Sequence, residues 1–106
     1  MSTQLPKAVS QFRKRHPEVW KALNDLGERC HEAGPLDERS RRLVKLALSI
    51  GAGLEGATHS AVRNARESGI TREEINHVAV LAISTLGLPA ATRAMTWISD
   101  NPRRAI

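Results

Sequence analysis

The chain has little cysteine and few aromatic side chains. Its single cysteine, Cys30, excludes an internal disulfide, a redox pair of cysteines and a zinc site built mainly from thiolates. Aromatic residues make up only 3% of the sequence, so few rings are available to stack on nucleic acid bases. No stretch reaches the roughly 18 consecutive apolar residues of a membrane-spanning helix, and the first residues form no apolar signal segment. We therefore expect a cytoplasmic protein without a membrane partner.

The composition is that of a small globular protein with an excess of positive charge. The 106 residues are 41% hydrophobic and 25% charged, which indicates a single domain over residues 1–106. Lysine and arginine number 16 against 11 acidic residues, giving a net charge of +5. This balance suggests a nucleic acid or an acidic ligand as partner. The basic residues fall in three short runs, however, and solvated helix faces explain these runs as well.

The apolar residues recur at helical spacing, and no run alternates in the way that a strand requires. The fold class expected is therefore all-α, with about six helices. They are a short basic helix at about 7–15, one from Pro17 to the stop at Gly34, one after an Asp37 N-cap, one from 55 to about 68, one starting at Thr71, and a last one through 91–98.

The fifth of these helices has the strongest start signal and an unusual apolar pattern. Thr71 and Glu74 have the spacing of a capping box, in which each side chain accepts a hydrogen bond from the other residue's backbone amide. Val80 and Leu81 place apolar surface outside the main stripe of this helix. Two explanations stay open. The helix contributes to a subunit interface, or it lies wholly inside one domain.

One segment has the spacing of a DNA-binding motif. Ala65, Gly69 and Ile75 correspond to the small residue, the turn glycine and the branched residue of a helix-turn-helix. The first turn of the helix that would read DNA, however, contains Glu73 and Glu74, which would face phosphates. A DNA-binding regulator is therefore an alternative that the charges disfavour, and nucleic acid is not the partner we expect.

Two histidines are candidates for acid and base chemistry. His59 lies one helical turn after Glu55, and His77 lies one turn after Glu73, so each ring has a carboxylate placed to raise its pKa or to orient it. Each is a candidate general acid or base. An exposed ion pair on a helix face explains the same spacing. No HExxH motif and no dense cluster of ligands is present, so we predict no metal site and no cofactor.

Three segments together resemble a known family. They are LDERSRRLVKLAL at 36–48, GLEGATHSAVRNA at 53–65 and GITREEI at 69–75. The sequence from about 36 to 98 resembles the carboxymuconolactone decarboxylase family, which includes the AhpD alkylhydroperoxidases. This resemblance implies an all-helical fold that assembles with itself, as a homotrimer or homohexamer. It also accounts for the helix-turn-helix spacing.

The resemblance also places the catalytic residues of the peroxidase branch. Its glutamate falls at Arg42, its two cysteines fall at Leu54 and Ala57, and its histidine falls at Ala61. A thiol peroxidase needs one thiolate to attack the peroxide and a second thiol to resolve the sulfenate. We therefore expect no thiol peroxidase activity at this site, despite the resemblance.

The decarboxylase branch implies a pocket for an acidic lactone beside a histidine on the fourth helix. His59 lies two residues before that histidine's position, on a face turned by about 200°. The function expected is binding or decarboxylation of a small carboxylate or lactone. Arg42 and Glu55 would bind the substrate, and His59 or His77 would handle protons. Two alternatives remain, since Arg42 can be a solvated residue of a basic run, and the chain can be a binding or assembly module without catalysis.

Overall fold

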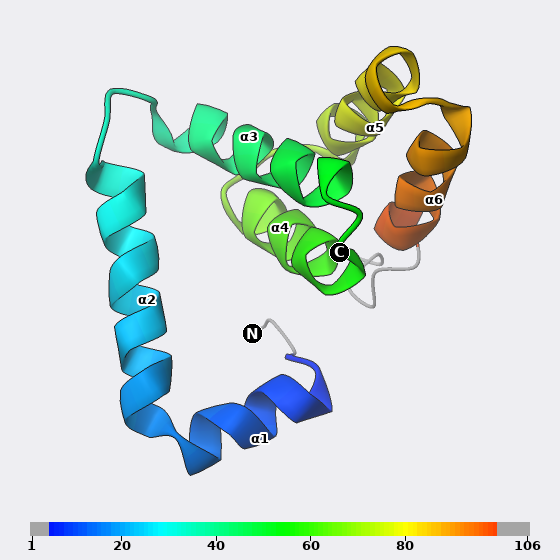
Figure 1. Ribbon diagram of the computed structural model, residues 1–106. Coiled ribbons are helices and arrows are strands. Elements are labelled where there is room, and N and C mark those ends of the chain that lie inside the picture. The colour runs from blue at the N-terminus through cyan, green and yellow to red at the C-terminus, as the bar shows by residue number, and fades with distance from the viewer. Residues whose placement is uncertain (1–4, 100–106) are drawn as a thin grey trace. The chain divides into compact units, whose positions relative to one another are not determined.

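The computed structural model describes residues 5–99, which form two compact units with a boundary between Leu36 and Asp37 (Figure 1). All six elements in the described range are α-helices, so the all-α prediction is confirmed. The first five helices begin within about one residue of the expected positions, because glycines, prolines and capping residues mark most of the boundaries. The last helix, expected through 91–98, begins three residues earlier, at Leu88. The single domain expected over 1–106 stays a prediction.

The first unit contains α1 (Lys7–Arg15) and α2 (Pro17–Glu32), and neither helix buries a residue. The ring of Phe12 lies 5.7 Å from that of His16 and 6.3 Å from that of Trp20, measured between centroids. The apolar side chains of α2 remain largely in solvent, with Val19 and Leu23 both 54% exposed. This unit is therefore an amphipathic helix pair without a hydrophobic core of its own.

The second unit contains α3 (Glu38–Gly51), α4 (Glu55–Glu67), α5 (Arg72–Leu86) and α6 (Leu88–Ser99). The main pairs are α3 with α4 and α5 with α6, and α3 also packs on α5 (Figure 1). The core is made of small and branched apolar residues from all four helices and from the connection between α4 and α5: Leu46, Ile50, Val62, Ala65, Ile70, Ile75, Ala79, Ala82, Ala91, Ala94 and Ile98. Many of them are alanines, which let the helix backbones approach closely.

Local signals fix the helix ends in this unit. The carboxylate of Asp37 accepts a hydrogen bond from the Ser40 amide at 2.8 Å, so the predicted N-cap of α3 is confirmed. The capping box of α5 is also present, with Thr71 and Glu74 each accepting from the other's amide. Gly69 lies between α4 and α5 with φ at 90°, a conformation that favours glycine.

Helix α5 carries apolar residues on its inner and outer faces. Ile75, Ala79 and Ala82 are buried in the core. Val80 and Leu81, on the outer side, are 50% and 58% exposed.

Neither α5 nor any other helix within residues 5–99 combines the length and the apolar character needed to cross a bilayer.

Candidate functional site

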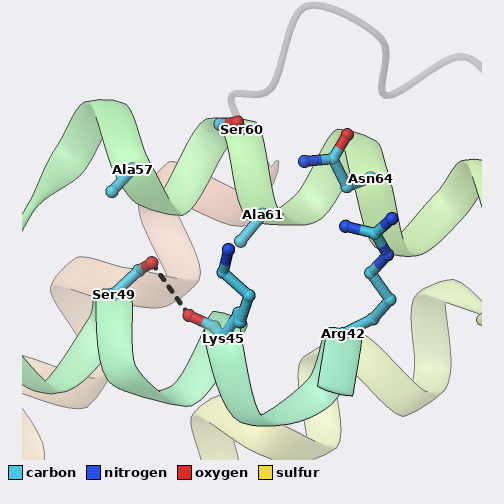
Figure 2. A pocket seen from close by; sticks show the side chains of 7 residues that line it. All are labelled: Arg42, Lys45, Ser49, Ala57, Ser60, Ala61 and Asn64. Atoms are coloured by element: carbon cyan, nitrogen blue, oxygen red, sulfur yellow. Dashed lines mark hydrogen bonds between the residues drawn. The ribbon is translucent and has the colours of Figure 1, made fainter. Parts of the chain in front are cut away.

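A pocket of about 190 Å³ lies between α3 and α4 (Figure 2). The residues that line it are Arg42, Lys45 and Ser49 from α3, and Ala57, Ser60, Ala61 and Asn64 from α4. Helical spacing explains the set, because residues three or four apart on each helix share one face. The resemblance implied a pocket beside a histidine on the fourth helix, and α4 does form one wall, but no histidine and no residue of α5 lines this pocket.

The pocket is cationic. Arg42 and Lys45 extend from α3 toward α4, and the guanidinium of Arg42 lies on the side of Asn64 (Figure 2). No acidic residue is among those that line the pocket. The opposite wall offers the methyl groups of Ala57 and Ala61, with the polar side chains of Ser60 and Asn64 beside them. This combination suits a small organic anion with an apolar body.

Arg42 is held in place by a neighbour on its own helix. Its Nε donates to Oε2 of Glu38 at 2.8 Å, and its side chain is 25% exposed. Glu38 also accepts hydrogen bonds from Arg41 at 3.0 Å and from the Ser68 hydroxyl at 3.1 Å. The hydrogen bonds from Arg42 and then Arg41 lower the pKa of Glu38 to about 2. Glu38 is therefore ionised at neutral pH.

The other predicted site residues lie outside the lining of this pocket. His59 Nε2 is 3.3 Å from Oε2 of Glu55, so the expected pair of these two residues on α4 is present. The ring of His59 is largely buried, whereas the carboxylate of Glu55 is 62% exposed. His77 lies on α5 beside Arg39 and Glu74, in an open groove between α3 and α5. The four predicted residues therefore occupy three places, and only Arg42 lines the α3–α4 pocket.

Comparison with known proteins defines the family. The sequence model of the Carboxymuconolactone decarboxylase family matches residues 17–100. The chain belongs to this family. The match begins well before residue 36, where the resemblance in the sequence had started, and so it includes α2.

Two relatives come from Methanocaldococcus jannaschii. Uncharacterized protein MJ1511 is 29% identical over 94 residues, which cover 89% of this chain and 88% of the relative. Uncharacterized protein MJ0742 is 27% identical over 90 residues, covering 84% of this chain and 86% of the relative. No solved structure gives a match.

The resemblance placed the four peroxidase residues at Arg42, Leu54, Ala57 and Ala61, and the structure shows where these positions lie. Arg42, Ala57 and Ala61, which stand at three of the four positions, line the same pocket. Leu54, at the fourth position, is 54% exposed and lies outside the lining. On the mapping that the resemblance implies, three of the four positions therefore meet in one pocket, and no residue that lines it carries a thiol.

Four polar residues that line the pocket were not among the predicted site residues, namely Lys45, Ser49, Ser60 and Asn64. Lys45 belongs to one of the three basic runs of the sequence and lies one helical turn after Arg42. Ser60 and Asn64 are four residues apart on α4 and alternate with the two alanines, Ala57 and Ala61, a spacing that places all of them on one side of the helix. The missing information was that α3 and α4 pack against each other.

Nothing in the described range of this family member gathers metal ligands. Among residues 5–99, no three histidine, cysteine, aspartate or glutamate side chains lie together as a metal site requires.

The start of α5 is occupied by internal contacts, since Glu74 forms the capping box and an ion pair with Arg39. The acidic first turn that disfavoured DNA binding is thus part of the helix start.

Proposed function

We propose that this protein binds a small carboxylate or lactone in the α3–α4 pocket, with Arg42 holding the anionic group. The observation that carries the proposal is the position of the Arg42 guanidinium in a pocket that has a second cation, Lys45, and no acidic lining residue. A guanidinium donates two parallel hydrogen bonds to a carboxylate, which gives both affinity and orientation. The alanine methyl groups on α4 would contact the apolar part of the ligand.

Decarboxylation is the finer form of this proposal. The bond between the carboxylate carbon and the rest of the ligand breaks, and CO2 is released. The electron pair of that bond stays on the rest of the ligand until an acid donates a proton to it. His59, oriented by Glu55, or His77 would supply that acid. Neither histidine is among the residues lining the pocket. This geometry favours the alternative of a binding module without catalysis, which would need Arg42 and no proton donor.

Binding is tested by titrating a panel of small carboxylates and lactones in a calorimeter. Replacing Arg42 by alanine should lower the affinity of the best ligand by about tenfold or more, because a charge-assisted pair of hydrogen bonds is lost. Arg29→Ala is the matched control, since it removes one positive charge from an exposed site on α2. An Arg42→Ala variant that binds as tightly as the wild type would refute the proposal.

Turnover is tested with the ligands that bind. Release of CO2 by the wild type, and its loss in His59→Ala or His77→Ala with binding retained, would support the decarboxylase form. Binding without CO2 release would favour the binding module. If no member of the panel binds, decarboxylation and ligand binding are both excluded for this panel, and the assembly role remains.

We also propose that the chain self-associates, as a homotrimer or homohexamer. The proposal is supported by the exposed apolar residues Val80 and Leu81 on α5 and Val44 on α3, which is 44% exposed. Native mass spectrometry measures the state directly. Leu81→Glu should convert the assembly to monomers, because a charge at a buried interface position is costly. A monomeric wild-type protein would contradict this proposal.

A further inference from the structure

Glu38 connects the cationic pocket to the C-terminal end of α4. It is the first residue of α3, and its Oε2 accepts hydrogen bonds from Arg42 on α3 and from Ser68, the C-cap residue of α4. Its other oxygen accepts from Arg41. The carboxylate therefore accepts hydrogen bonds from both helices that enclose the pocket, and one of the donors is Nε of Arg42.

The contact with Glu38 uses one particular nitrogen of Arg42. Nε is engaged, whereas neither terminal nitrogen forms a hydrogen bond with any residue of the described range. Because the guanidinium is planar, holding Nε also restricts the directions of the two terminal NH2 groups. These groups lie on the pocket side, facing the Asn64 wall of α4 (Figure 2).

We propose that Glu38 is the positioning residue of this site, and that it makes Arg42 take a ligand carboxylate end-on through its two terminal nitrogens. The side-on arrangement, which uses Nε and one terminal nitrogen, is closed because Glu38 occupies Nε. This inference rests on the proposed binding function and adds the geometry of recognition. A ligand whose carboxylate projects from its body fits this arrangement, because it can reach both nitrogens together.

The charges remain favourable for an anion in the presence of Glu38. Arg42 and Lys45 carry two positive charges and Glu38 carries one negative charge, so these three residues together leave a net positive charge at the pocket. The hydrogen bonds from Arg42 and Arg41 hold the pKa of Glu38 at about 2, so this balance is constant at neutral pH.

The sign of one substitution distinguishes positioning from simple electrostatics. Removing a negative charge beside an anion site should strengthen anion binding if Glu38 is only a neighbour. If Glu38 positions Arg42, Glu38→Ala should weaken binding despite the gain in positive charge. Glu38→Gln keeps an oxygen that can accept from Nε, so it should recover part of the loss.

The first measurement needs no ligand. Exchange of the Arg42 Nε proton with water is followed by NMR on the full chain, and the signal is assigned by its disappearance in Arg42→Lys. We expect slow exchange in the wild type and exchange at least about tenfold faster in Glu38→Ala, because the acceptor is lost. Ser68→Ala should give an intermediate rate. Glu73→Gln, a first-turn glutamate on α5, is the control and should change nothing.

The second measurement uses acetate as the probe, titrated into wild type, Glu38→Gln and Glu38→Ala. We expect affinity to fall in that order, by about tenfold from first to last. Stronger binding by Glu38→Ala, or equal Nε exchange in Glu38→Ala and wild type, would overturn the inference. If acetate binds none of the three while the exchange rates differ as expected, the positioning of Arg42 by Glu38 stands and the binding function proposed above is wrong.

Discussion

The two units of the chain have similar helices but differ in what those helices bury. Helices α1 and α2 bury no residue, although α2 has a regular apolar stripe. Helices α3 to α6 bury at least two residues each and share one core. Apolar spacing therefore predicts a helix but does not show that its stripe is covered. Burial depends on partners that the local sequence does not reveal.

Removal of one core side chain should show this difference most strongly. Leu46→Ala on α3 removes a fully buried side chain and should cost about 2–5 kcal/mol of unfolding free energy. Leu23→Ala on α2 removes a side chain that is 54% exposed, and the cost should be within about 0.5 kcal/mol. Urea unfolding followed by circular dichroism measures both. Equal losses would mean that the stripe of α2 is covered in solution.

Helix caps provide a second comparison. Thr71 caps α5 with a side-chain hydrogen bond, whereas His16 at the start of α2 has none. Thr71→Ala should therefore lower the unfolding free energy by about 0.5–2 kcal/mol. His16→Ala should lower it by only about a few tenths of a kcal/mol, because no capping hydrogen bond is lost. The same urea titration compares the two variants. A larger loss at His16 would contradict the difference between the units.

Acid should weaken the second unit through its helix starts. The amide of Ser40 lowers the pKa of Asp37, the amide of Thr71 lowers that of Glu74, and Arg42 lowers that of Glu38 to about 2. Because these pKa values lie below those of the unfolded chain, the folded state binds fewer protons. The stabilisation is complete above about pH 5 and is lost as the pH falls toward 2.

This pH dependence is measured as the free energy of unfolding at several pH values between 6 and about 2. Glu38→Gln removes one of the titrating groups, so its curve should be flatter than that of the wild type. A wild-type stability that stays constant across this window would contradict the assignment of these carboxylates. In contrast, α1 has no acidic residue in its first turn, so its start offers no such group.

The smallest effect is expected at the junction of α1 and α2. Phe12→Ala removes the edge contact with Trp20. Aromatic pairs of this kind stabilise proteins by about 0.5–1.5 kcal/mol. In a Trp97→Phe background, the emission of Trp20 should shift to longer wavelength as its ring becomes more exposed. The unfolding free energy of the second unit should not change. Unaltered Trp20 emission would mean that the contact does not persist in solution.

The sequence was sufficient for the helices and only partly for the site. Asp37, Thr71 and Gly69 act through their immediate neighbours, and such local signals can be recognised without a structure. Pockets depend on which helices pack together, and this depends on contacts between distant residues. The rotation of His59 away from the position of Ala61 was visible from helix geometry, and Ala61 does line the pocket while His59 does not. The contribution of Lys45 to the pocket depends on the packing of α3 against α4, which the local sequence does not reveal.

We have proposed that the α3–α4 pocket holds an anion through Arg42. Its most direct test is an NMR titration of the full chain with acetate, which follows every backbone amide. We expect the largest shifts to cluster at Arg42, Lys45, Ala57 and Ala61, and we expect Arg42→Ala to abolish them. Shifts centred on His77 and the α3–α5 groove, or shifts that persist in Arg42→Ala, would contradict it.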